Sequence, residues 1–163
     1  MLPDVLEENL NIVFCGTAAG DKSALLKLYY AGQGNKFWST LYKTGLTPTQ
    51  LAPTNYSKLL EFGIGLTDLE KNTSGMDHKI LFTDQGITTL REKIEKYQPR
   101  ILCFNGKRAA EEFLFREVDY GLQPETIAQT KLFVAPSTSG AANRFWNEEL
   151  WHELKDIATV KKP

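Results

Sequence analysis

The chain has 163 residues, 42% of them hydrophobic and 24% charged, and its formal net charge is −1. This size and composition predict one globular domain, residues 1–163, with a core of its own. The near-neutral charge provides no global basic field, so a nucleic acid would have to be bound by a local patch. No apolar run reaches the roughly 18 residues that a membrane-spanning helix needs.

Four short apolar segments predict buried strands. They are bounded by Gly, Pro or polar turn residues and cover residues 10–16, 63–68, 100–106 and 131–136. Helical spacing of apolar residues, together with start and stop signals, predicts helices over 35–45, 54–62, 78–97, 106–115 and 145–157. This alternation is typical of a three-layer α/β/α sandwich with a central, mainly parallel four-stranded sheet.

Particular residues mark the predicted helix ends. Gly45 can end the helix over 35–45, and Pro99 lies just beyond the helix that ends at residue 97. Thr54 is the expected cap of the helix over 54–62.

The two cysteines and the N-terminal residues indicate in which cellular compartment we expect the protein. Cys15 and Cys103 lie inside apolar runs, which favours reduced core thiols in a cytoplasmic protein. Two thiols are too few for the four that an iron–sulfur cluster usually needs. The acidic start "MLPDVLEENL" lacks the basic and then apolar pattern of a secretory leader.

Ligands of such sheets bind beyond the carboxyl ends of the strands, so these ends are the candidate site. The first end comprises Gly16, Thr17, Ala18, Ala19 and Gly20. Small side chains let a ligand approach the main chain, whose amides can hold an anion or a carbonyl oxygen. The dinucleotide and phosphate-loop motifs are both absent. The alternative interpretation is a tight strand-to-helix turn.

The other strand ends carry polar residues with two interpretations each. Asp68 ends the second strand, where it could act as a carboxylate base or cap the following turn. The run "APSTSGAAN" could contact a phosphate backbone or form a polar surface loop. Lys107 could contact a phosphate at a helix start or simply be solvated.

Taken together, the segments "IVFCG", "GNKFW", "GIGLTD", "FNGK" and "APSTSGA" resemble the mismatch-specific uracil/thymine DNA glycosylase family of the uracil-DNA glycosylase superfamily. The resemblance covers about residues 5–158. It implies an α/β/α protein, expected to be a monomer, that flips a damaged base out of DNA and hydrolyses its N-glycosidic bond. It implies no cofactor and no metal.

The chain departs from the family pattern in its first motif. The resemblance places the family's water-positioning Asn at Ala18, and a methyl group cannot orient water. Asp68 is the best replacement, as a general base or as an electrostatic stabiliser of the sugar cation. Asn105 is the second candidate for this role. If no group replaces the Asn, the protein has lost catalysis.

The resemblance also assigns binding residues. Tyr30 matches the aromatic residue that stacks on the flipped base, with Tyr29 as the alternative one residue away and core packing as the alternative role. Asn35 is more readily interpreted as a helix cap than as a base contact.

The second motif supplies the expected DNA contacts, which are Ser137, Thr138 and Ser139. The family inserts a large side chain into the duplex from the residues that follow. Here only Arg144 is long enough, which predicts weaker duplex flipping and better use of single strands. His78 could assist if its loop covered the site, and His152 is expected to be peripheral.

Three functions remain open at this point. The first is a glycosylase acting on uracil or a related deaminated or mismatched base, in duplex or single-stranded DNA. The second is a non-catalytic DNA lesion-binding protein of the same fold, favoured by Ala18. The third is a nucleobase- or nucleoside-binding protein, favoured by the net charge of −1.

Overall fold

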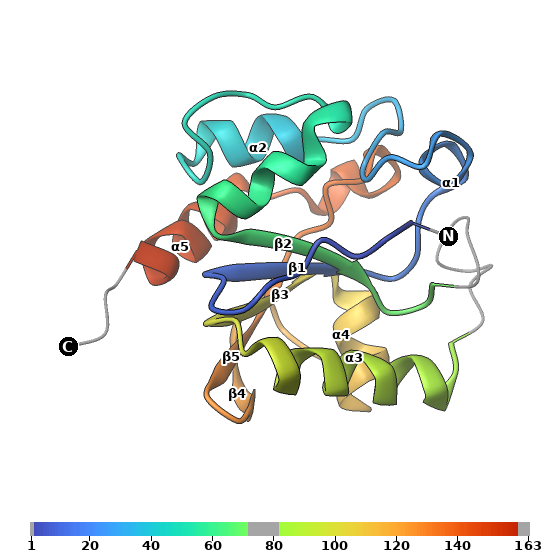
Figure 1. The fold of residues 1–163 in the computed structure, drawn as a ribbon, viewed down its shortest axis with the longest axis vertical. Helices are drawn as coiled ribbons and strands as arrows, with labels where there is room; N and C mark the ends of the chain where they lie inside the picture. The colour runs from blue at the N-terminus through green and yellow to red at the C-terminus, as the bar shows by residue number, and fades with distance from the viewer. Residues whose placement is uncertain (1, 72–81, 160–163) are drawn as a thin grey trace.

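The computed structural model describes residues 2–71 and 82–159, which form a β-sheet between two layers of helices (Figure 1). In chain order the elements are β1 (Ile12–Gly16), α1 (Asp21–Leu26), α2 (Phe37–Lys43), η1 (Pro53–Phe62), β2 (Ile64–Asp68), α3 (Asp84–Tyr97), β3 (Ile101–Asn105), α4 (Lys107–Leu114), β4 (Gly121–Ile127), β5 (Thr130–Ala135), η3 (Gly140–Phe145) and α5 (Glu148–Thr159).

The sheet has the strand order β2-β1-β3-β5-β4. β1 pairs in parallel with β2 and β3, and β3 pairs in parallel with β5, so four strands end at the same edge of the sheet. This arrangement confirms the predicted α/β class and the mainly parallel sheet. The predicted number of strands was wrong, because the sheet has five strands rather than four.

The additional strand, β4, runs antiparallel to β5 at the edge of the sheet. Its side chains alternate between buried and exposed positions, so it lacks the continuous apolar run that marks the other strands. It also contains Pro124, which an edge strand tolerates, and its register shifts between Leu122 and Thr126. These polar and turn-forming residues are the reason why the sequence pattern missed it.

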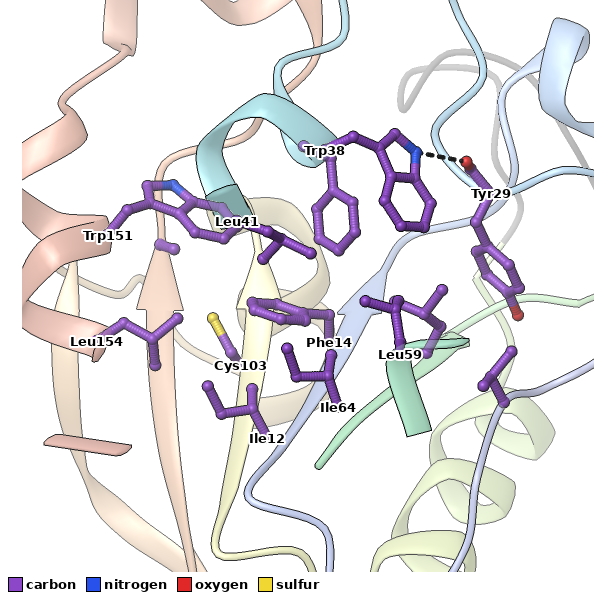
Figure 2. Close-up of a cluster of buried hydrophobic side chains, with 14 of the residues drawn as sticks. Ile12, Phe14, Tyr29, Trp38, Leu41, Leu59, Ile64, Cys103, Trp151 and Leu154 are labelled. Atoms are coloured by element: carbon purple, nitrogen blue, oxygen red, sulfur yellow. Dashed lines mark hydrogen bonds between the residues drawn. The ribbon is translucent and has the colours of Figure 1, made fainter. Parts of the chain in front are cut away.

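Successive side chains of the buried strands point to opposite faces of the sheet and form two cores. Ile12 and Phe14 pack beneath α2, η1 and α5, whereas Val13 and Cys15 pack against α3 and α4 (Figure 1). Figure 2 shows the first of these cores, in which Phe14 stacks against Trp151 with ring centroids 5.4 Å apart. The two cysteines are free and fully buried, as predicted.

The helices differ from their predicted forms in detail. Gly45 follows α2 with φ of 80°, as a residue that ends a helix should. Thr54 is not a cap, because η1 begins one residue earlier, at Pro53, whose fixed φ suits a first helical position. α1 and η3 were not predicted, since each is only six residues long. Residues 78–81 of the predicted third helix lie outside the described residues. Within the described part, no helix is long and apolar enough to cross a membrane.

Candidate functional site at the carboxyl ends of the strands

The candidate site lies where β1 and β2 end side by side. The parallel register pairs Gly16 with Asp68, the last residue of each strand. A methyl group added at Gly16 would lie 3.2 Å from Asp68 Oδ1 and 3.5 Å from Tyr30 Oη. Because Gly16 has no side chain, a carboxyl oxygen and a hydroxyl face one small space together.

The Asp68 carboxyl group is almost fully buried, with 6% of the residue exposed. Burial raises its pKa, and the nearby Lys71 ammonium, 3.4 Å from Oδ2, offsets that increase only in part. No backbone amide within residues 2–71 and 82–159 donates to this carboxyl group. Within those residues its hydrogen-bond partner is the Lys71 ammonium rather than a turn amide, and Oδ1 lies toward Gly16.

Tyr30 reaches the site from the segment between α1 and α2. Its backbone takes a left-handed conformation, with φ of 52°, and its ring stacks on Phe37 with centroids 4.0 Å apart. The hydroxyl is buried and has no hydrogen-bond partner of acceptable geometry in the described part of the chain. Burial and the charge of Asp68 both raise the pKa of Tyr30.

Tyr29, the alternative to Tyr30 for stacking on a base, packs in the hydrophobic core instead. Only 2% of it is exposed, and its hydroxyl donates a hydrogen bond to the carbonyl of Pro3 at 2.9 Å. Its main-chain carbonyl accepts a hydrogen bond from the indole of Trp38 (Figure 2). Of the two tyrosines, Tyr30 is the one whose hydroxyl lies beside Gly16.

The loop from Thr17 to Gly20 is fastened to the residues that follow β2. The amide of Leu69 donates to the carbonyl of Gly16, and the amide of Glu70 donates to the carbonyl of Thr17, both at 2.8 Å. Thr17, Ala18 and Ala19 are half-buried, whereas Gly20 is exposed and precedes α1. This places the predicted small-residue loop directly beside Asp68.

The second motif is tied to β3 by a reciprocal pair of hydrogen bonds. The Asn105 amide donates to Thr138 Oγ1, and the Thr138 backbone amide donates to Asn105 Oδ1, both at 3.0 Å. Thr138 is fully buried and anchors the loop through these bonds, and the predicted DNA contact by its side chain stays a prediction. Asn105 lies near enough to Tyr30 to lower the pKa of that hydroxyl somewhat, but its bonds to Thr138 give it a structural role.

The two serines of this motif are half-buried and make local turns. Ser137 Oγ accepts a hydrogen bond from the amide of Ser139, and Ser139 Oγ accepts one from the amide of Ala141 at the start of η3. Each hydroxyl therefore has an accepting role in shaping the loop, while its own proton remains available to another acceptor.

The predicted basic contacts lie on α4 and η3. Lys107 begins α4, and its ammonium lies 4.5 Å from the centroid of the Tyr120 ring. Arg144 is exposed on η3, with its guanidinium 4.7 Å from the centroid of the Phe145 ring. Lys36 joins η3 to the segment before α2, because its ammonium bonds the side chain of Asn143.

Two of the remaining polar candidates, Asn35 and His152, make hydrogen bonds with residues of the nearby chain. Asn35 Oδ1 accepts a hydrogen bond from the amide of Phe37, the first residue of α2, although the residue at the N-cap position is Lys36. His152 lies on α5, where its ring nitrogen is 3.2 Å from Glu148. His78 lies outside the described residues.

Sequence reasoning missed the charged residues behind Asp68. Lys71 lies between Asp68 and Asp4, at 3.4 Å and 2.8 Å from their respective oxygens. The spacing of three residues between Asp68 and Lys71 was a signal, but nothing in the sequence indicated that the N-terminal segment supplies a second carboxylate.

Comparison with known proteins supports the fold. A solution NMR structure from Methanosarcina acetivorans, described as a "putative Uracil DNA glycosylase", matches with a TM-score of 0.65 and 28% sequence identity. The match covers 96% of this chain and 94% of that one. The model of the Uracil DNA glycosylase superfamily matches residues 3–158. The chain belongs to the uracil DNA glycosylase superfamily.

The uracil DNA glycosylase superfamily consists of DNA glycosylases, which are hydrolases that act on DNA. The polar groups described above lie beyond the carboxyl ends of the parallel strands, where α/β sheets generally bind their ligands. The mismatch-specific family within the superfamily stays a prediction.

Proposed function

We propose that this protein is a monofunctional DNA glycosylase that excises uracil or a related deaminated or mismatched base. Asp68 is the catalytic residue in this proposal. The proposal depends chiefly on one observation, which is that Asp68 Oδ1 faces the space left open by Gly16. Superfamily membership supports the class of reaction.

The chemistry accounts for a carboxylate at this position. When the bond between C1′ of the sugar and the base nitrogen breaks, the electron pair leaves with the base and the sugar becomes cation-like. Water adds to C1′ and loses a proton, and the base gains a proton. A carboxylate beside C1′ can stabilise the cation and accept the proton of the water. Ala18 cannot do either, because its side chain is a methyl group.

The small-residue loop and Tyr30 form the base pocket in this proposal. The target base must rotate out of the stack to reach the strand ends. Thr17, Ala18 and Ala19 allow the base to approach the main chain, and Gly16 allows it to approach Asp68. Stacking against an aromatic ring such as that of Tyr30 contributes about 1–3 kcal/mol per base.

The proposed DNA contacts are Ser137, Ser139, Lys107 and Arg144. Hydroxyl and cationic groups of this kind bind the phosphate backbone and set the register of the nucleic acid. Arg144 is the one long side chain of the second-motif segment, and it is exposed. Because a single exposed Arg is a poor wedge, we expect single strands and unstable pairs to be cleaved faster than stable duplexes.

The first test is a cleavage panel on labelled single strands and duplexes. The substrates carry uracil, thymine opposite guanine, hypoxanthine or xanthine, and alkali reveals the abasic sites. We expect wild type to cleave at least one substrate. Asp68→Asn should lower the rate about 10²- to 10⁴-fold, which is the usual contribution of general acid–base catalysis.

The controls separate a catalytic from a structural effect. Asn105→Ala removes the amide that anchors Thr138, Asn35→Ala removes an amide at the start of α2, and Asp156→Asn removes an exposed carboxylate on α5. Thermal unfolding checks that each variant is folded. An unchanged rate in folded Asp68→Asn would contradict the catalytic assignment. No cleavage by wild type, with cleavage gained in Ala18→Asn, would indicate a lesion-binding protein.

A further inference from the structure

The Lys71 ammonium is surrounded by acceptors. An ammonium has three protons, and here they are shared among four oxygens. These are Asp4 Oδ1 at 2.8 Å, Tyr29 Oη at 2.8 Å, the Leu2 carbonyl at 3.2 Å and Asp68 Oδ2 at 3.4 Å. Only 15% of the Lys71 side chain is exposed, so water contributes little to holding this charge in place.

The N-terminal segment fixes the ammonium from the other side. Asp4 accepts a hydrogen bond from Thr67 at 2.7 Å and pairs with Lys93 of α3 at 2.6 Å. Val5 exchanges two backbone hydrogen bonds with Leu66, each 2.9 Å long. Asp4 is therefore held at a fixed position beside β2, and Lys71 lies between two carboxylates.

The two oxygens of Asp68 have different surroundings. Oδ2 lies toward Lys71, and Oδ1 lies toward the space at Gly16. A single contact to Oδ2 thus restricts the rotation of the carboxyl group and keeps Oδ1 directed at the site. The same contact favours the ionised form of a group that burial would otherwise neutralise.

We propose that Lys71 is a positioning residue for Asp68, and that Asp4 in the N-terminal segment holds Lys71 in place. Its ammonium favours the ionised form of the buried carboxyl group and keeps Oδ1 directed at the space beside Gly16. The link to catalysis depends on the proposed role of Asp68, whereas the electrostatic link between Lys71 and Asp68 does not.

Several charged or titratable groups surround Asp68, and the test must separate them. Lys71 and Asp4 act most strongly on its pKa, and Lys93 acts more weakly. The Cys15 thiol and the hydroxyls of Tyr29 and Tyr30 also interact with its charge, and burial keeps all three neutral. Lys93 is the matched control, because it contacts Asp4 but not Asp68.

The experiment follows the Asp68 carboxyl group by carbon-13 NMR as a function of pH, with its signal assigned from its loss in Asp68→Asn. In Lys71→Gln the charge is lost but hydrogen-bonding groups remain. We expect the titration midpoint to rise by about one pH unit or more. Lys71→Arg should restore it toward the wild-type value, and Lys93→Gln should move it much less. A midpoint that stays in place in Lys71→Gln, or that moves equally in Lys93→Gln, would overturn the proposal.

A second measurement needs no variant and so does not depend on the folding of Lys71→Gln. In wild type, the ζ-nitrogen signal of Lys71 should shift at the midpoint of the Asp68 titration. If the Lys71 signal does not shift at that pH, the proposal is also overturned.

Cleavage rates then test the link to catalysis. The acid limb of the pH–rate profile should move to higher pH in Lys71→Gln, together with the titration midpoint of the carboxyl group. The reason is that a larger fraction of Asp68 is protonated at a given pH. A raised midpoint with an unmoved pH–rate profile would show that Lys71 positions Asp68 but that the proposed catalytic role of Asp68 is wrong.

Discussion

Gly16 shapes the site through the side chain that it lacks. An added methyl group would lie 3.2 Å from Asp68 Oδ1, which is closer than carbon and oxygen normally approach. We expect Gly16→Ala to lower the cleavage rate at least tenfold, because either the carboxyl group or the substrate must move. Gly20→Ala in the same loop is the control, since its methyl group would meet nothing within 4 Å. Equal rates for the two variants would show that the substrate does not use this space.

Individual residues of the site differ in how far the sequence could predict them. Asp68 was placed correctly at the end of its strand, because an apolar run followed by a polar residue marks that position. The burial of Thr138 could not be predicted, since it depends on Asn105, which belongs to a strand far away in the sequence. The same holds for Lys71, whose environment depends on Asp4 and thus on a contact between segments far apart in the chain.

At the scale of elements, β2 depends on the close approach of the N-terminal segment. A methyl group at Gly65 would lie 2.5 Å from the carbonyl oxygen of Val5 and 2.7 Å from Leu10 Cδ1. We expect Gly65→Ala to lower the free energy of unfolding by about 1–3 kcal/mol, as overpacking usually does. Gly32→Ala, whose methyl group would meet nothing within 4 Å, should change it far less. Urea denaturation of both variants measures this difference.

Elements with a strong periodic pattern were predicted well, and those stabilised by tertiary contacts were not. The four parallel strands are buried along most of their length, so each contains a short apolar run in the sequence. β4 is an edge strand with one exposed face, and its pairing with β5 defines it better than its composition does. η3 is a short helix whose start is capped by Ser139, a residue that the family resemblance assigns as a DNA contact.

For the molecule as a whole, the buried carboxyl groups make stability depend on pH. The folded pKa of Asp68 is raised, so its stabilising contribution is complete below the unfolded pKa and is lost as pH rises through the folded pKa. Burial raises the pKa of Asp4, but its contacts with Lys71, Lys93 and Thr67 outweigh that effect and the net pKa is lowered. Its contribution is therefore present above the unfolded pKa and is lost as pH falls through the folded pKa.

This reasoning predicts the pH dependence of one variant. The free energy of unfolding of Asp68→Asn, minus that of wild type, should increase as pH rises from about 4 to about 7. The increase should be about 1.4 kcal/mol for each pH unit by which folding raises the pKa of Asp68. Urea denaturation across this range provides the values, with Asp156→Asn as the exposed control. A difference that is flat or falls with pH would contradict the raised pKa.

The strand order also has a consequence for how the chain folds during synthesis. β1 emerges from the ribosome first, yet it lies between β2 and β3, so one of its edges stays unpaired until residues 101–105 have been made (Figure 1). Asp4 likewise lacks its ion-pair partner on α3 until Lys93 has been made. Contacts between distant parts of a chain form slowly, and an unpaired edge strand invites aggregation in the meantime. The nascent chain is therefore most exposed to misfolding before β3 is complete, and slower translation of the segment between β2 and β3 would prolong that period.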